Sequence, residues 1–383
     1  MLAASTMLTI GGGSRLSGAL LLAWASVALV QAQSPQSKET LLRLSQPFPD
    51  ADQMRQRKAS AEALPLFAGE EPIAFTFTGD FRAVNRDHDP NSRRQYPMQL
   101  TMSRPSGEVD TLPVMLNARG HVRRMARTCD YVPLRIQFPK DQIANTIFAG
   151  QERLKLVVQC RNGGVFEQYL LKEYLAYRIY NTLTTHGLRA RLAKVSYVDQ
   201  AGKPVGTRFG MLLEDDSDMA KRVEGRVLEL QRTLFKDLDA DTLSTMMVFS
   251  YMIGSTDFSI YVLHNVIMVQ KPDRKLYPVP YDFDMAGLVS SPYAIPDKQL
   301  PITNVKDRYY RGPCHTSEQL RPVLAKFNTQ KDRVLALPDA IADLSRSSRD
   351  EVKRYLQEFY SSISDPATVR RPFVEGCSKS PGM

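Results

Sequence analysis

The hydrophobic pattern of the chain begins with short segments of strand character. Between residues 72 and 160, β-branched and aromatic residues alternate or cluster between turn residues. The segments are PIAFTFTGDF, YPMQLTMSR, DTLPVMLNARG, PLRIQF and LKLVVQC, at residues 72–81, 96–104, 110–120, 133–138 and 154–160. They predict a mostly antiparallel sheet. Alternating strand–helix units are missing, which argues against Rossmann and TIM folds.

The pattern then becomes helical. Over residues 165–185, Leu171, Leu175, Ile179 and Leu183 form an i, i+4 ridge, and apolar residues extend nearly all round. This predicts a helix buried between the sheet and another element. The remaining pattern predicts a hairpin, an apolar helix, two short strands and two amphipathic helices, at residues 191–216, 239–254, 264–270, 275–283, 317–344 and 347–362.

The N-terminal residues have the pattern of an export signal. Arg15 precedes the apolar run LSGALLLAWASVALVQAQS, and Val30 and Ala32 fit positions −3 and −1 of a signal-peptidase site. A lone membrane anchor is the alternative, although the run is short for a membrane span. We therefore expect a signal peptide at residues 1–32, no transmembrane segment in the mature chain, and an exported protein, periplasmic or extracellular.

The predicted elements divide the rest of the chain into three stretches. Residues 33–66 are rich in Gln, Ser, Lys and Ala, which is typical of a linker, here with one short amphipathic helix. Residues 67–215 contain the predicted sheet, the buried helix and the hairpin, and residues 216–383 are mainly helical. The order of elements indicates an α+β fold.

The cysteine count agrees with export. The four cysteines are Cys129, Cys160, Cys314 and Cys377, and no CxxC pair occurs among them. In an exported chain an even number predicts two disulfides, for which three pairings exist. Cys129 and Cys160 each lie at the margin of a predicted strand, which favours the pairs 129–160 and 314–377. Four free buried thiols are the alternative for a chain that is not exported.

The charge and motif content exclude several function classes. The 383 residues carry a net charge of +9, dispersed except around Arg119, Arg123, Arg124 and Arg127. Such a cluster is typical of a solvated surface, with an anionic partner as the alternative. No zinc finger, RRM signature or helix-turn-helix occurs, so we expect no nucleic-acid partner. The missing GxSxG, HExxH and GxxxxGK[ST] motifs argue against serine hydrolases, zincins and P-loop NTPases.

Residues suited to phosphoryl transfer occur in order along the chain. The reaction needs a lysine on the phosphates, a glutamate that orients it, a carboxylate at the nucleophile, and an Asn and an Asp on Mg²⁺. The candidates are Lys155, Glu173, Asp257, Asn265, Asp282 and Asp284. Each has a structural alternative, such as a strand surface for Lys155, a solvent-facing helix position for Glu173 or a turn cap for Asp257. Glu167 fits helix-dipole stabilisation, and His264 a structural histidine rather than a base.

Several of these residues lie in motifs that resemble a known family. GSTD, HN and VPYDFDMAG, at residues 254–257, 264–265 and 279–287, resemble the active-site motifs of atypical kinases of the spore-coat CotH type. HipA-type kinases are more distantly similar. NARGHVRR and PLRIQF, at residues 117–124 and 133–138, also look like a CotH region. The resemblance covers roughly residues 116–287.

The resemblance implies a bilobal protein-kinase-like fold, with an antiparallel β-rich N-lobe at 67–215 and a mainly helical C-lobe at 216–383. It implies Asp257 as the catalytic residue and Asn265, Asp282 and Asp284 at the metal. ATP and Mg²⁺ are the implied cofactors. Lys155, oriented by Glu173, would hold phosphate together with Arg119 of the ARG segment. Arg135 is the alternative to Lys155.

We expect the three aspartates and Asn265 to converge on one cleft, because neighbouring carboxylates beside apolar elements are costly without a cation. The function predicted first is an exported CotH-like kinase that phosphorylates a protein or another hydroxyl acceptor. A catalytically silent envelope protein that binds a partner or a surface polymer is the second hypothesis. A metal-dependent hydrolase that uses the aspartate cluster is the third.

The export signal leads to the first testable prediction. The mature protein should begin near Gln33, because Val30 and Ala32 fit the cleavage site. Intact-mass and peptide mass spectrometry of exported material measure this directly. An intact Met1 in that material would contradict the prediction.

Overall fold

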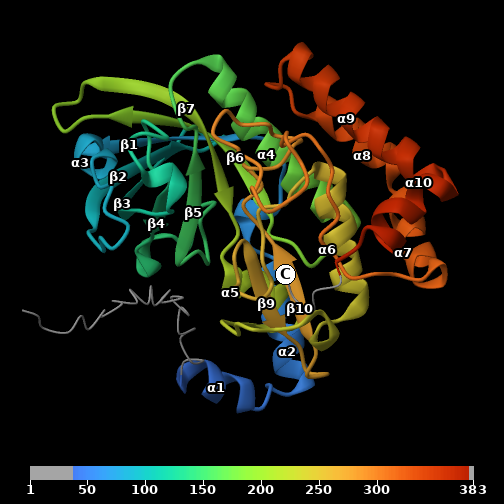
Figure 1. The fold of residues 1–383 in the computed structure, drawn as a ribbon. Coiled ribbons are helices and arrows are strands. Elements are labelled where there is room, and N and C mark those ends of the chain that lie inside the picture. The colour runs from blue at the N-terminus through green and yellow to red at the C-terminus, as the bar shows by residue number, and fades with distance from the viewer. Residues whose placement is uncertain (1–37, 379–383) are drawn as a thin grey trace, which may run out of the picture.

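The structure is a computed structural model that describes residues 38–378. The predicted signal peptide lies outside the described residues. Strands of the first half close into a barrel in the order β1-β2-β3-β4-β5-β7-β6 (Figure 1). They are β1 (Ile73–Gly79), β2 (Tyr96–Ser103), β3 (Val109–Ala118), β4 (Leu134–Gln137), β5 (Arg153–Val158), β6 (Ala190–Val198) and β7 (Pro204–Leu213). Every strand predicted between residues 72 and 160 is present.

The barrel interior explains the alternating pattern of its strands. In β1, Ile73, Phe75 and Phe77 are buried, and the residues between them are more exposed. Side chains from the other strands, such as Leu100 and Leu134, belong to the same apolar cluster. The burial of these side chains from every strand provides the hydrophobic stabilisation of the barrel.

The expected bilobal kinase-like fold, with an antiparallel β-rich N-lobe and a mainly helical C-lobe, is wrong, because the strands form a closed mixed barrel. The barrel closes because β1 pairs in parallel with β6, from Ile73 opposite Ala193 to Thr78 opposite Val198. The two strands are more than a hundred positions apart in the chain. A period of two predicts that each segment is a strand, but it carries no information about distant partners. The closure of the barrel therefore depends on tertiary contacts that the local sequence pattern does not reveal.

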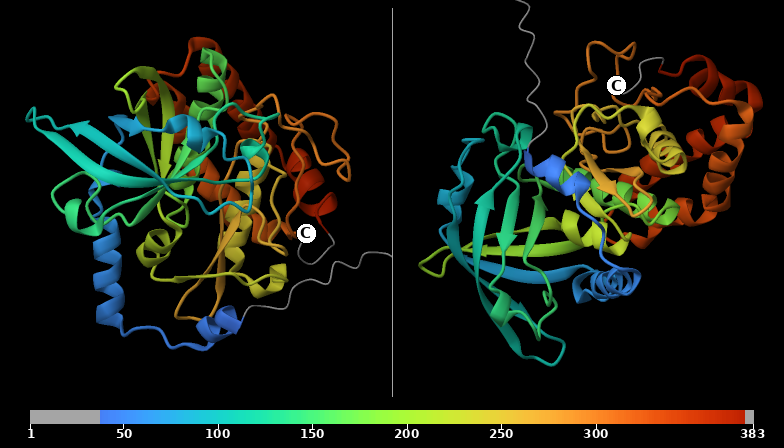
Figure 2. Two further views of the ribbon diagram at one scale, coloured as in Figure 1. Left: turned by 90° about the vertical axis from the view of Figure 1, so that its left-hand side faces the viewer. Right: turned by 90° about the horizontal axis from the view of Figure 1, so that it is seen from below.

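A second hydrophobic core contains helices and a small sheet. The sheet has the order β10-β9-β8, formed by β8 (Arg226–Leu228), β9 (Val266–Gln270) and β10 (Leu276–Pro280). The helices are α4 (Gly164–Leu183), α6 (Ala240–Ile253), α7 (Ser317–Thr329), α8 (Lys331–Ala340), α9 (Arg346–Ser364) and α10 (Pro366–Arg370). In Figure 1 the helices α7 to α10 lie on the side away from the barrel, and the view from below in Figure 2 agrees.

The predicted buried helix is α4, and it connects the two parts. Its side chains Leu171, Leu175 and Ile179 are fully buried. They belong to one cluster with Leu192 and Met211 of the barrel and with residues of α6 and α9. The apolar character all round the helix therefore reflects burial on several sides.

The predicted helix at 317–344 is divided in the structure. Gln330 separates α7 from α8. Phe327 and Val334 are both fully buried, so the apolar pattern continues across the break and does not reveal it. Short elements complete the chain: α3 (Phe81–Asn85), the 3-10 turns Pro65–Phe67, Val122–Arg124, Lys140–Gln142 and Phe235–Asp237, and the π turn Arg371–Glu375.

Residues 33–66 were expected to form a linker, and their described part, residues 38–66, contains two helices. They are α1 (Lys38–Ser45) and α2 (Ala51–Glu62), and α2 packs against α5 (Asp216–Arg222). The prediction of one short helix is wrong because Met54 and Ala61 of α2 are buried by tertiary contacts that local composition does not show.

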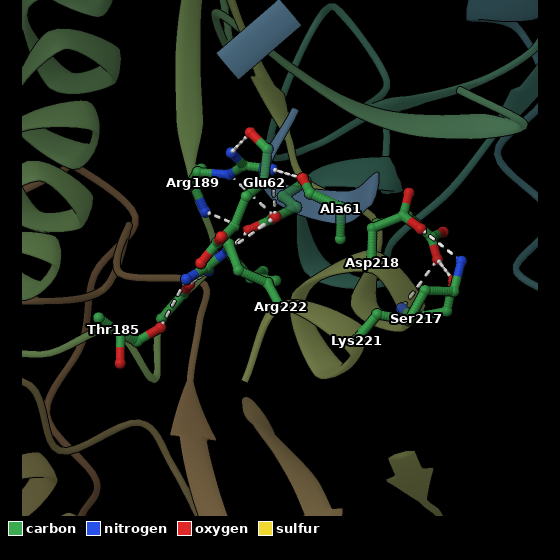
Figure 3. A network of polar contacts seen from close by, with 12 residues as sticks. Ala61, Glu62, Thr185, Arg189, Ser217, Asp218, Lys221 and Arg222 are labelled. Atoms are coloured by element: carbon green, nitrogen blue, oxygen red, sulfur yellow. Dashed lines mark hydrogen bonds and ion pairs between the residues drawn. The ribbon is translucent and has the colours of Figure 1, made fainter. Parts of the chain in front are cut away.

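A buried glutamate joins this N-terminal stretch to the barrel. Glu214 is fully buried and pairs with Arg189 at 2.8 Å and with Arg222 at 2.9 Å. Figure 3 shows the two arginines also reaching backbone oxygens, including Ala61 O from Arg189 and Thr185 O from Arg222. Two guanidinium groups compensate the buried Glu214 carboxylate, and the cluster connects α2, β7 and α5.

Both predicted disulfides are confirmed. Cys129 is bonded to Cys160 and Cys314 to Cys377. Paired cysteines of this kind are typical of an oxidising compartment. Among residues 38–378, the structure contains no helix of the length and hydropathy that a membrane crossing requires.

A half-buried histidine after α4, His186, makes stability depend on pH. The His186 ring stacks on Tyr277 with centroids 5.2 Å apart, and burial lowers its pKa from 6.5 to about 4. The unfolded chain therefore binds the proton first, and stability is lost as pH falls from 6.5 towards 4, by up to roughly 3 kcal/mol.

The variant His186→Gln should lose less stability than the parent protein between pH 7 and pH 5, as measured by urea unfolding. Equal losses in both proteins would contradict this assignment.

Candidate functional site

A pocket of about 430 Å³ lies between the barrel and the helical part. Its walls come from the loop after β3, from α4, and from the segments that follow α6 and β10. The polar and charged residues that line it are Arg119, His121, Arg123, Glu173, Tyr177, Asp257, His264, Asn265, Tyr281, Asp282 and Asp284. All four residues expected to converge on one cleft, Asp257, Asn265, Asp282 and Asp284, are among them.

Backbone hydrogen bonds bring the motif segments of the pocket together. Helix α6 ends at Gly254, which has a φ of 66°, and Gly287 N donates to Gly254 O at 3.0 Å. Tyr281 N donates to Asn265 O at 3.0 Å, just beyond the paired strands β9 and β10. The end of α6, the start of β9 and the segment after β10 are therefore held side by side.

Two of the candidate residues have unusual backbone conformations. Asn265 has a φ of 53° and Asp282 a φ of 63°, both in the left-handed region. Asn and Asp tolerate this region better than other side chains, although it still costs free energy. Asp282 N donates to Tyr177 Oη at 2.9 Å. Such strain persists where the surrounding structure imposes it, which occurs often at functional sites.

Asp257 is held by its two neighbours in the pocket. His264 Nε2 lies 2.9 Å from Asp257 Oδ1, and Asn265 Nδ2 donates to Asp257 Oδ2 at 3.1 Å. The hydrogen bond to Asp257 raises the pKa of His264 above its usual value, although burial opposes this. Both side chains of the pair remain partly exposed. Asp257 is therefore oriented and also accessible from the pocket.

The deep end of the pocket contains buried charges around one cation. Arg123 Nη1 lies 3.5 Å from Glu173 Oε2, and Arg123 Nε lies 4.0 Å from Asp284 Oδ2. Burial raises the pKa of Asp284 to about 7, and Asp282 adds to this effect. Burial likewise raises the pKa of Glu173 well above its usual value, and Arg123 offsets this only in part. Burial therefore favours the neutral forms of both carboxyls, and Arg123 offsets the cost of ionising them only in part.

Some of these buried polar atoms have no hydrogen-bond partner. Arg123 Nε and Glu173 Oε1 are both buried and unsatisfied. Arg123 does donate to Val158 O through Nη2, and Tyr293 Oη donates to Asp284 Oδ2 at 3.0 Å. Unsatisfied buried groups are uncommon because each costs free energy, and they are frequent where a ligand or an ion completes the site.

The expected ion pair between Lys155 and Glu173 does not form. Lys155 Nζ contacts Asp216 Oδ1 at 2.6 Å and lies 5.0 Å from the centre of the Tyr281 ring, while Glu173 pairs with Arg123. Burial lowers the pKa of Lys155. The proposed alternative, Arg135, lies directly opposite Lys155 across β4 and β5. Both cations are therefore beside the pocket rather than among the residues that line it.

Sequence reasoning missed three residues of the site. The charge pattern places Arg123 in a basic surface cluster, His264 fits a structural histidine, and the pattern gives Tyr293 no role. The position of Arg123 in the segment NARGHVRR, next to Arg119, was the available signal. Tyr293 lies in an irregular stretch whose local pattern gives no such signal.

The carboxylates do not form a complete metal cage. In the part of the chain that the structure describes, no group of three or more His, Cys, Asp or Glu side chains is arranged to hold a metal ion. A cation here would need ligands from outside the protein in addition to one or two carboxylates.

Comparison with known proteins adds no assignment, since no protein-family model and no curated protein matches the chain.

The charge balance of the pocket leads to a stability prediction. Arg123→Met should lower the free energy of unfolding by about 3–5 kcal/mol, because it leaves Glu173 and Asp284 buried without their cation. Arg123→Met/Glu173→Gln should be less destabilised than the sum of its two single variants. Urea unfolding measures both, with the exposed Arg127→Met as a control that should change little. Additive losses would show that the two side chains do not interact.

Proposed function

We propose that the protein is an exported, ATP-dependent phosphotransferase that acts with Mg²⁺ on a hydroxyl acceptor. One observation carries the proposal: Asp257, Asn265, Asp282 and Asp284 line a single pocket together with arginines. Carboxylates and cations in one cavity suit a ligand that is itself an anion bound to a metal. The proposal rests on this pocket and on the motif resemblance to CotH-type kinases, and it requires no kinase-like fold.

The donor set of the pocket suits Mg²⁺ bound together with nucleotide. Mg²⁺ usually takes one or two protein carboxylates, keeps waters, and obtains its remaining ligands from phosphates. Asp282 and Asp284 provide carboxylate oxygens and Asn265 an amide oxygen, without a full protein cage. When bound, the metal neutralises charge on the phosphates. It would also offset the mutual repulsion of Asp282 and Asp284.

The other residues have roles that follow from their positions. Arg119 and Arg123 line the pocket and would hold phosphate oxygens, with the unsatisfied Arg123 Nε available for this. Glu173 keeps Arg123 in place. Asp257, oriented by His264 and Asn265, would position the acceptor hydroxyl and accept its proton.

A catalytically silent protein that binds a partner or a surface polymer is the second candidate. The observation that favours it is Lys155, which pairs with Asp216 instead of reaching Glu173. A phosphotransferase needs its phosphate-binding cations directed at the nucleotide, whereas a binding protein does not. Export also favours this candidate, because ATP is scarce outside the cytoplasm.

Nucleotide-dependent stabilisation distinguishes the two candidates. A ligand that binds only the folded protein at 100 times its Kd adds roughly 2.7 kcal/mol of stability. We expect ATP with Mg²⁺ to raise the Tm of the parent, and Asp282→Asn to abolish this rise without lowering the Tm of the ligand-free protein, since repulsion falls. Differential scanning fluorimetry with and without Mg²⁺ measures both.

The matched control is Asp350→Asn, an exposed aspartate on α9 that should keep the full nucleotide response. A parent protein that MgATP does not stabilise would contradict the phosphotransferase proposal. An Asp282→Asn variant that responds like the parent would contradict the assigned metal site.

A further inference from the structure

A second pocket of about 370 Å³ adjoins the first. The two share Asp257, His264 and Met285, and each also has walls of its own. The oriented pair of Asp257 and His264 therefore lies at the boundary between two cavities, of which only the first contains Asp282 and Asp284.

The backbone beside Asp257 is fixed from within the second pocket. Arg311 lines this pocket and donates through Nη1 to Thr256 O and, at 2.9 Å, to Phe258 O. These carbonyls flank Asp257 on both sides. The arginine thus holds the carboxylate of Asp257 at the boundary, which is the position from which it can reach a group in either cavity.

The outer rim of the second pocket is aliphatic. Val262 is 50% exposed and Ile295 is 71% exposed, and both line the pocket. Val262 lies at the tip of a tight loop whose ends are joined by Ser259 N donating to His264 O and by the reverse bond, both at 2.9 Å. Exposed aliphatic side chains on a pocket rim provide apolar contacts for a bound partner.

We propose that the second pocket binds the acceptor, and that the acceptor is a serine or threonine of a peptide segment with aliphatic neighbours. This rests on the proposed phosphotransfer function. The hydroxyl reaches Asp257 at the boundary, and the neighbouring aliphatic side chains contact Val262 and Ile295 on the rim.

A peptide fits these walls better than a sugar polymer. Sugar rings bind well on exposed aromatic faces, but the aromatic side chain of this lining, Phe258, is buried and lies 5.2 Å from the Arg311 guanidinium. The exposed apolar contacts are aliphatic instead, which suits apolar residues beside the reacting serine or threonine.

ATP donates the phosphoryl group in the transfer step. The acceptor oxygen forms a bond to the γ-phosphorus, and the bond between that phosphorus and the β–γ bridging oxygen breaks. The electron pair of the broken bond leaves with ADP. The hydroxyl proton passes to the carboxylate of Asp257, which His264 contacts at Oδ1 and Asn265 at Oδ2.

Equilibrium selection from a synthetic peptide library tests binding without any turnover. The library has a fixed central serine with two varied residues on each side, and the bound fraction is sequenced by mass spectrometry. We expect enrichment of Val, Ile and Leu beside the serine. The double variant Val262→Ser/Ile295→Ser should bind the selected peptide roughly tenfold more weakly. Val109→Ser, an equally exposed valine on β3 outside both pockets, should bind it like the parent.

A second measurement separates this proposal from the phosphotransfer function. With MgATP, the parent should phosphorylate the selected peptide, and the double variant should transfer less while keeping the full nucleotide-dependent rise in Tm. Absent enrichment, or equal binding by the double variant, would overturn the peptide site even if MgATP binds. Peptide binding by a protein that MgATP does not stabilise would instead overturn the phosphotransfer function, and the acceptor role with it.

Discussion

The candidate site depends on one buried cation, Arg123, placed between Glu173 and Asp284. An isolated buried charge is very costly, so the loop with Arg123, helix α4 and the segment after β10 are stable together rather than separately. The Cys129–Cys160 disulfide and the bond from Arg119 N to Pro133 O at 2.8 Å restrain the loop that carries Arg123. This interaction therefore couples the barrel to the helical part at the pocket.

The two hydrophobic cores provide the rigid frame for this pocket. The barrel core and the helical core are separate clusters, with α4 packed between the barrel surface and the helices. The cluster around Glu214 connects the N-terminal helix α2 to the barrel and to α5, away from the site. Polar side chains on loops between such rigid elements are held in place while remaining accessible to ligands, which is the usual arrangement for binding sites.

The pocket combines several features that occur singly elsewhere in the chain. Asn265 and Asp282 have left-handed backbones, and Arg123 and Glu173 contain buried polar atoms without partners. Natural sequences are locally consistent except where function requires otherwise. The coincidence of two such backbones, two unpartnered buried atoms and two buried carboxyls with raised pKa values in one pocket is the physical reason to place the function there.

The sequence by itself determined the strands, the buried helix α4 and the candidate carboxylates, because periodicity and residue type are local properties. It favoured the observed cysteine pairing among three possible ones. It also indicated that Asp257 and Asp282 would lie together, through the order of the motifs. Only the tertiary structure decided the parallel closure of β1 on β6, the choice of Arg123 rather than Lys155 as the partner of Glu173, and the packing of the N-terminal helices. These features depend on contacts between residues distant in the chain, and a hydrophobic pattern specifies which side chains are buried but not which partners they meet.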